Sequence, residues 1–362
     1  MQSENAFETG AQPPLAAEDK PRRGRKKWLI PVQALMFLVG LSILVLVIYR
    51  IGYANVLESI SRVGWGFLIV IALNLTRHMG RALTMYIAVS PEHRTFKYRS
   101  AVAARLGGDA MNSVSFVGPF LGDATKAMLL KRSVGLTHGA SAVIIDNVLY
   151  YVTVIVVILA GVATLVATVG GGDFVMREVL LGIVIVAILM FTGIVLAMMY
   201  RVKPLTHVID LLERRHLAPG FVLRKRDAIR TVESNVFHFY HERRADFFKI
   251  FAISMAVHAV SVTEVYTVLS FLDERAVVKN AFIIESLTKV INAAFSFIPS
   301  AIGVYEGGNG VILKTLGYTT AAGVALGLVR RGAILFSAAI GLSIVIWRTT
   351  EASAKRLANS RE

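Results

Sequence analysis

The stretch Ser296–Gly308, which reads SFIPSAIGVYEGG, interrupts an apolar part of the chain with a proline, glycines and a glutamate. The chain is apolar from Ala276 up to this stretch and apolar again from its end through Leu316. Irregular backbone at membrane depth is tolerated only where it is buried in protein or lines a water-filled cavity. We therefore expect a broken helix here, with Glu306 lining a polar cavity inside a membrane protein.

The rest of the 362-residue chain has the composition of a polytopic membrane protein. It is 55% hydrophobic, and apolar runs of about 20 residues, enough to cross the hydrocarbon core of a bilayer, recur along it. The net charge of +15 falls in clusters beside these runs, where it sets orientation and attracts anionic lipids at the cytoplasmic face, so no nucleic-acid partner is expected. The absence of cysteine excludes disulfides, thiolate metal sites and cysteine nucleophiles.

The apolar runs predict an all-α fold with about six full crossings. The expected crossings are Trp28–Tyr49, Trp65–Val89, His138–Val169, Val179–Tyr200, Phe247–Leu272 and Thr320–Trp347, with a short interfacial helix at Ile51–Val63. We expect a disordered basic tail at 1–27, a single transmembrane domain at 28–347 with repeat halves of about 65–200 and 247–347, and a second tail at 348–362. The loop 201–246 carries ten Lys/Arg against six Asp/Glu, which places it and both termini in the cytoplasm of a bacterial-type plasma (inner) membrane.

A second broken segment lies in the first half of the chain. NSVSFVGPFLGDATK, from Asn112, and NAAFSFIPSAIGVYEGG, from Asn292, share in order an asparagine, Ser-Phe, a proline and a glycine followed by an acid. The expected structural breaks are Pro119, Gly122, Pro299 and Gly303. Three crossings separate the two copies, so we expect two broken hairpins, re-entrant or short pairs, related as an inverted repeat. Transporters use this construction to hold polar cargo near the bilayer midplane.

The motifs GPxxGDxxK (Gly118–Lys126) and PxxxGVYE (Pro299–Glu306), with Arg81 and the basic mid-chain loop, resemble the lysylphosphatidylglycerol synthase transmembrane region, also called the flippase-like domain family. The resemblance spans roughly Trp28 to Trp347. It implies a module of eight spans or a similar number. In the multiple peptide resistance factor this module moves an aminoacylated phospholipid across the bilayer, while a separate soluble domain synthesises it. Neither the tail after Trp347 nor the loop 201–246 is long enough for such a domain, so the resemblance implies transport without synthesis.

Charged residues at membrane depth are the candidates for binding the polar part of a lipid, because each costs about 2.5–3.5 kcal/mol to insert. The candidate substrate-binding residues are Arg77, Arg81, Asp123, Lys126, Asp146, Glu306, Arg330 and Arg331. Arg77 and Arg81 lie one turn apart and suit a phosphate, with the alternative that Arg81 only approaches the interface.

For several of these charges, a local structural ion pair is the alternative to substrate binding. Asp123 and Lys126, at i and i+3, are placed to neutralise each other. Glu285 and Lys289, at i and i+4, are read equally as a structural pair or as cavity wall. Glu306 has no basic residue in the next turn, so Arg330 or Arg331 is its expected partner.

Other polar residues carry weaker signals. His258 and Glu264 differ by six positions, so each is read as a satisfied buried group. The two histidines of HFYH (His238–His241) have no clear third ligand, and no metal or cofactor is expected. No phosphate-binding loop, G-x-S-x-G or H-E-x-x-H motif is present, so no catalytic residue is assigned.

Two classes of function follow. The first is a translocase (flippase) that moves a lipid or lipid-linked headgroup between leaflets through a polar cavity between the inverted hairpins, where arginines bind an anionic headgroup. The second is a membrane-embedded transferase that modifies a lipid headgroup, with Asp123, Asp146 or Glu306 as general base. The inverted repeat favours transport over an enzyme. The cargo is left open among phospholipid, polyprenyl-linked and hopanoid-type lipids, and a homo-oligomer is also left open.

Overall fold

The computed structural model describes residues 42, 45, 46, 49, 53–114, 119–170, 174–200, 203–215, 226–272, 275–296, 298 and 301–359. Over these residues the chain is helical and forms no strand, which confirms the predicted all-α fold. The predicted N-terminal tail lies outside the described residues, as does the predicted crossing Trp28–Tyr49 apart from four of its positions.

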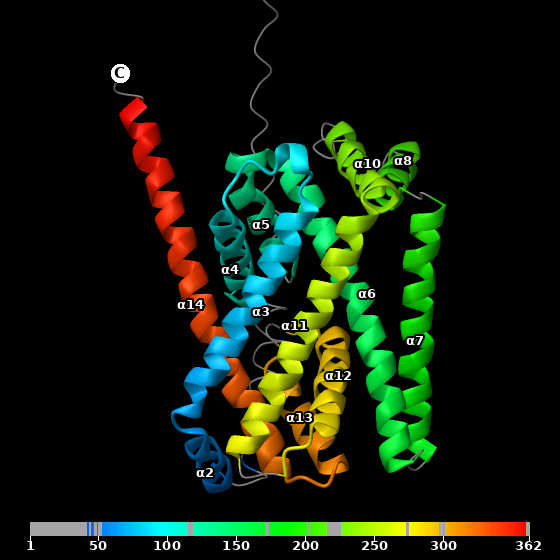
Figure 1. The fold of residues 1–362 in the computed structure, drawn as a ribbon, viewed down its shortest axis with the longest axis vertical. Coiled ribbons are helices and arrows are strands. Elements are labelled where there is room, and N and C mark those ends of the chain that lie inside the picture. Colours follow the sequence, from blue (N-terminus) through cyan, green and yellow to red (C-terminus); the bar gives the residue numbers. More distant parts are fainter. Residues whose placement is uncertain are drawn as a thin grey trace, which may run out of the picture.

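Five long helices form the body of the molecule (Figure 1). They are α3 (Gly66–Ala88), α6 (Leu136–Val169), α7 (Phe174–Met199), α11 (Arg244–Phe271) and α14 (Thr320–Asn359). Of these, α6, α7, α11 and α14 are long and apolar enough to cross a membrane, and α3 passes the same test when counted with α2 (Tyr53–Val63), from which it is bent by 76°. These helices occupy the positions of the predicted second to sixth crossings, so the described part of the chain contains four or five candidate spans.

Two pairs of short helices lie at the predicted breaks. They are α4 (Tyr98–Val114) with α5 (Pro119–Val134), and α12 (Val278–Ala294) with α13 (Val304–Thr315). The longest of these has 17 residues, fewer than the about 20 that a full crossing needs. In Figure 1, α4 and α5 lie at the end of the molecule that carries α8 (Pro204–Arg214) and α10 (Arg226–Glu242), which we call the α10 end. The pair α12 and α13 lies at the opposite end, the α2 end. An inverted repeat requires this arrangement, although the repeat itself stays a prediction.

Two helix ends bear on the predicted boundaries. The predicted last crossing, Thr320–Trp347, has the bounds of the candidate span, but the helix α14 itself continues to Asn359 through the basic segment after Trp347. Before the second break, α12 ends at Ala294, just ahead of the stretch Ser296–Gly308. Pro119 is the first residue of α5, a position that proline tolerates because the first N–H of a helix has no intrahelical partner. Pro299 lies outside the described residues.

Glycine allows α4 and α5 to pack with their backbones close together. A Cβ atom added to Gly122 would lie 2.7 Å from the carbonyl oxygen of Gly108, and one added to Gly108 would lie 2.7 Å from the carbonyl oxygen of Gly122. In lipid, small residues promote helix association because they let van der Waals contacts form along the backbone. The predicted break residue Gly122 therefore serves the contact between the two arms of the hairpin.

Two apolar cores lie one above the other along α3 and α11. The core toward the α2 end includes Val70 of α3 and Leu269 of α11, and the core toward the α10 end includes Met85 of α3 and Ile250 of α11. Arg77 and Arg81 of α3 and His258 and Glu264 of α11 fall between these positions in the sequence. The charged groups described next therefore lie near the middle of the bundle, between the two cores.

Candidate functional site

The polar face of α3 divides between two ion networks. Arg77 and Arg81 lie one turn apart near the middle of the helix. The Arg77 Nη1 atom lies 2.8 Å from Glu264 Oε2 of α11, whereas the Arg81 Nη2 atom lies 2.8 Å from Asp146 Oδ2 of α6. The two arginines that the sequence groups at one headgroup therefore belong to separate sets of charges.

The first network joins α3, α4, α5 and α6. It consists of Arg81, Arg105 and Lys126 with Asp109, Asp123 and Asp146. Asp146 is almost fully buried and is shared by two arginines, since Arg105 Nη1 lies 3.2 Å from its Oδ2 atom. The Thr84 hydroxyl donates to Oδ1 of the same carboxylate. This network brings together four of the predicted site residues: Arg81, Asp123, Lys126 and Asp146.

Asp109 of α4 is the centre of the hairpin side of the first network. Its Oδ2 atom lies 2.7 Å from Arg105 Nε and 3.1 Å from His78 Nδ1, and its Oδ1 atom lies 2.9 Å from Lys126 Nζ. Lys126 also lies 3.0 Å from Asp123, which is the local pair expected from the sequence. The second oxygen of Asp123 accepts from the Asn147 amide of α6 at 2.8 Å. The hairpin α4–α5 is thus linked to α3 through His78, and to α6 through the Arg105–Asp146 ion pair and the Asn147 amide.

The second network joins α3, α11, α12 and α14. It consists of Arg77, Lys289 and Arg330 with Glu264 and Glu285. Arg330 bridges the two carboxylates, with Nε 3.0 Å from Glu264 and Nη1 2.9 Å from Glu285. Lys289 Nζ lies 2.6 Å from Glu285, so the expected pair at i and i+4 forms, but within a larger set. Glu264, which the sequence suggested only as a satisfied buried group, is fully buried and binds two arginines.

Glu306 pairs with Arg331, one of the two partners that the sequence offered. Its Oε1 atom accepts from Arg331 Nε, while Oε2 accepts from the Gly303 N–H at 2.8 Å and so closes the first turn of α13. Gly303 has a φ of +78°, in the left-handed region that side chains other than glycine rarely adopt. The acid is fully buried, and its role in lining a polar cavity stays a prediction.

Tyr150 of α6 connects the first network with the centre of the bundle. The guanidinium carbon of Arg81 lies 3.8 Å from the centre of the Tyr150 ring, within the range of a cation–π contact. His258 of α11 stacks on the same ring at a centroid distance of 5.1 Å. His258 Nε2 lies 3.0 Å from the Thr153 hydroxyl. A mid-height layer of polar groups therefore runs from α4 through α6 to α11.

The charges of these groups do not cancel completely. In the first network three cations face three carboxylates, and the pair of Glu306 and Arg331 is also balanced. In the second network three cations face two carboxylates. Among the side chains that the structure describes here, one positive charge is therefore in excess. A charge at membrane depth is costly without a counter-ion.

Some members of the networks were not assigned from the sequence. Arg105 and Asp109 lie at i and i+4 inside the first broken hairpin, and that spacing within an apolar segment was the available signal. Glu264 gave no comparable signal, because its partners lie 187 and 66 residues away along the chain. Its role follows from the packing of α11 against α3 and α14.

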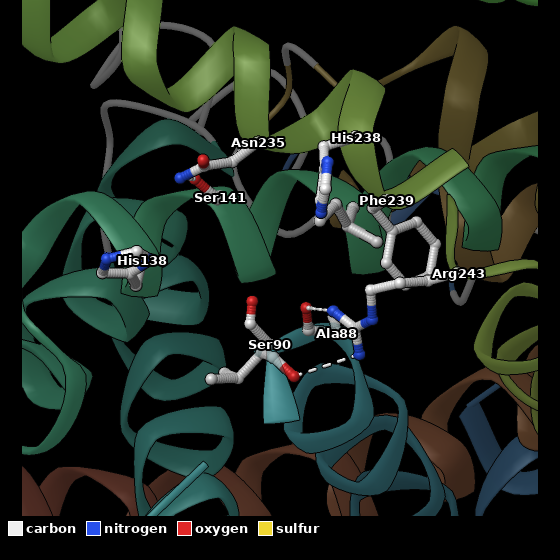
Figure 2. Close-up of a pocket in the computed structure, with 10 residues that line it drawn as sticks. Ala88, Ser90, His138, Ser141, Asn235, His238, Phe239 and Arg243 are labelled. Atoms are coloured by element: carbon white, nitrogen blue, oxygen red, sulfur yellow. Dashed lines mark hydrogen bonds between the residues drawn. The ribbon is translucent and has the colours of Figure 1, made fainter. Parts of the chain in front are cut away.

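A small pocket at the α10 end is a separate feature (Figure 2). Its volume is about 30 Å³, room for one or two water molecules, and polar side chains including His138, Ser141, Asn235 and His238 line it. Arg243, on its rim, donates to the carbonyl oxygens of residues 87, 88 and 89 at 2.7–3.1 Å, so it caps the C-terminal end of α3. The pocket is too small for a lipid headgroup. No group of three or more metal-ligating side chains occurs in the described ranges.

Comparison with known proteins assigns the chain to a family. Residues 33–341 match the model of the family described as the lysylphosphatidylglycerol synthase TM region. No curated protein and no solved structure matches the chain. The family match covers most of the sequence, including every charged residue of the two networks and the Glu306 pair. The chain therefore belongs to the lysylphosphatidylglycerol synthase transmembrane-region family, a family of membrane-embedded domains of lipid-related proteins.

Proposed function

We propose that this protein is a lipid translocase, which moves a lipid or a lipid-linked polar headgroup between the leaflets while the apolar chains stay in the bilayer. The observation that carries the proposal is the mid-height layer of buried charges, drawn from both broken hairpins and from α3, α6, α11 and α14. A purely structural bundle has little need of charges there, because buried ion pairs are often no better than well-packed apolar side chains. Their presence is explained if a polar group passes at this depth.

The same charges suggest the chemistry of the cargo. Arginine presents a planar fork that suits phosphate oxygens, and Arg77 and Arg105 are both partly accessible at the edges of their networks. The second network has one cation more than it has carboxylates, and this excess favours a headgroup that carries a phosphate. The family name refers to a derivative of phosphatidylglycerol, so an anionic phospholipid is the first cargo to test.

The alternative, a transferase that uses a carboxylate as general base, has less support. All six oxygens of Asp123, Asp146 and Glu306 already accept from a cation or a hydrogen-bond donor. A general base needs an oxygen directed at the proton that it removes. The arrangement therefore fits the holding of charges better than proton abstraction from a headgroup.

We also propose that the α10 end faces the cytoplasm of a bacterial-type inner membrane. The loop 201–246, which contains α8 and α10, has the excess of basic residues that the positive-inside rule associates with this side. Both chain termini are placed on that side by the same reasoning, and anionic lipids are expected around it.

Reconstitution tests the translocase proposal. The purified protein is incorporated into phosphatidylcholine vesicles with a trace of fluorescent phosphatidylglycerol, and an impermeant reductant quenches the label in the outer leaflet. Translocation is expected to bring the inner-leaflet label within reach of the reductant, with the lipid chemically unchanged by mass spectrometry. Lys289→Gln, in the second network, should abolish the effect, whereas Lys249→Gln, an exposed lysine outside both networks, should retain it. Recovery of the lipid with a new covalent group, or no exchange with any anionic lipid, would overturn the proposal.

A further inference from the structure

His78 is the titratable histidine that contacts the first network directly. Its Nδ1 atom lies 3.1 Å from Asp109 Oδ2, and the side chains of both residues are 20% exposed. A neutral imidazole with its proton on Nδ1 donates to Asp109 and leaves Nε2 as an acceptor. A further proton on Nε2 makes the ring a cation without breaking this hydrogen bond. The contact can therefore change its charge while it keeps its geometry.

The charge of His78 decides the balance of the first network. With neutral His78, three cations face three carboxylates, and an entering anion finds no free positive charge. With protonated His78, the same network carries one positive charge in excess. Lys126 and Arg105 each divide their interactions between Asp109 and a second carboxylate, so a charged His78 also lets Asp109 release one of them toward a ligand.

We propose that His78 is the proton-binding group of this protein, and that a phosphate-bearing anion enters the first network together with one proton on His78 Nε2. The inference rests on the proposed translocation of an anionic lipid and adds its coupling to protons. The proton is taken up from the compartment to which the site is open and returned where the headgroup leaves. One singly charged headgroup and one proton then cross together, so the step moves no net charge and a pH gradient can drive it.

The surroundings of His78 fit this role. The other charged or titratable side chains around this part of α3 belong to five helices. They are Tyr98, Arg105 and Asp109 of α4, Asp123 and Lys126 of α5, Asp146 and Tyr150 of α6, His258 and Glu264 of α11, and Arg330 of α14. On α3 itself, Arg77 and Arg81 are each bound to a carboxylate of another helix. The direct partner of His78 is a carboxylate, that of Asp109, at 3.1 Å.

His258 is less suited to the same task. It is buried, and it stacks on the Tyr150 ring, which the Arg81 guanidinium also contacts. A positive charge on His258 would face Arg81 across this one ring and would have the Thr153 hydroxyl, not a carboxylate, as its partner.

Binding calorimetry tests the inference without requiring transport. Short-chain phosphatidylglycerol is titrated into the purified protein in buffers of different ionisation enthalpy, which reports the protons taken up on binding. The wild type is expected to take up close to one proton per lipid at pH 8, and by proton linkage its affinity should fall about tenfold per pH unit there. Glycerophosphoglycerol, the same diester without acyl chains, separates recognition of a lipid from recognition of a free phosphodiester. Short-chain phosphatidylcholine, which carries no net charge, should bind without proton uptake.

His78→Asn keeps a donor toward Asp109 but cannot titrate, so it should bind phosphatidylglycerol with weak, pH-independent affinity and no proton uptake. His78→Lys supplies a fixed cation and should bind at all pH values with no uptake. His207→Asn, on the exposed face of α8, is the matched control and should behave as the wild type. Equal proton uptake by His78→Asn and the wild type, pH-independent binding by the wild type, or no binding at any pH would overturn the inference. In the vesicle assay, exchange that is unaffected by pH and by His78→Asn would leave the translocase proposal standing and remove the proton coupling.

Discussion

Replacing Glu306 with glutamine tests whether this buried acid acts through its charge. Glutamine has nearly the same volume, and its carbonyl oxygen can still accept from the Gly303 N–H that Glu306 Oε2 binds at 2.8 Å. The first turn of α13 should therefore stay closed. What the substitution removes is the negative charge beside Arg331.

The expected loss of stability follows from the burial of the pair. Glu306 is fully buried, and the Arg331 side chain is 17% exposed. Breaking a buried ion pair costs about 3–5 kcal/mol, because the remaining charge stays buried without a counter-ion. We expect the lower end, about 3 kcal/mol, since Arg331 keeps some access to its surroundings. Replacing both residues with methionine removes both charges, and its main cost is the lost cap of α13, about 1 kcal/mol.

Thermal unfolding in lipid nanodiscs, followed by tryptophan fluorescence, measures these differences, and the vesicle assay measures translocation. If the pair is only structural, the double variant regains both stability and lipid exchange. If the pair belongs to the path of the cargo, the double variant is stable but exchanges no lipid. A Glu306→Gln protein with wild-type stability and a wild-type exchange rate would refute the reasoning in both forms.

Three further predictions concern orientation, packing and the second network. An impermeant maleimide should label a single cysteine at Gly170, after α6, from outside intact cells, and one at Arg226 only after permeabilisation; the reverse pattern would overturn the orientation, and labelling of both from the same side would overturn the inverted repeat. Gly122→Ala puts a Cβ 2.7 Å from a backbone oxygen of α4 and should lower the stability in nanodiscs by about 1–3 kcal/mol, whereas Gly193→Ala, in open space on α7, should leave the unfolding midpoint unchanged. Glu264→Gln leaves two arginines without their shared carboxylate and should cost about 3–5 kcal/mol in the same measurement; an unchanged midpoint would contradict the role of Glu264 in holding the second network.

The helical architecture was largely predictable, because apolar runs and helix-breaking residues act locally. The described helices occupy the predicted positions of the second to sixth crossings, and the short helices on either side of Pro119 and of Gly303 mark the predicted breaks. Helix ends were less predictable, as in α14, which continues past Trp347 to Asn359. A basic, polar segment is unfavourable in the hydrocarbon core, so the membrane span ends there. The helix itself can continue, because its backbone hydrogen bonds do not depend on lipid.

Ion pairs within one helix could also be read from their spacing. Asp123 with Lys126 and Glu285 with Lys289 form as expected, because residues three or four apart lie on the same helix face. The pairing of Glu264 with Arg77 spans 187 residues, and no local rule reports it. It depends on how α11 and α3 are rotated and packed against each other.

By itself, the sequence determined that this is an all-helical membrane protein with two broken hairpins and charges placed at membrane depth. These properties follow from hydropathy, proline, glycine and short spacings along one chain segment. Only the tertiary structure decided which charges meet. Arg330 and Arg331 are neighbours in the sequence, but successive residues of a helix point about 100° apart. One of them therefore bridges Glu264 and Glu285 while the other holds Glu306, and this division depends on which helices surround α14.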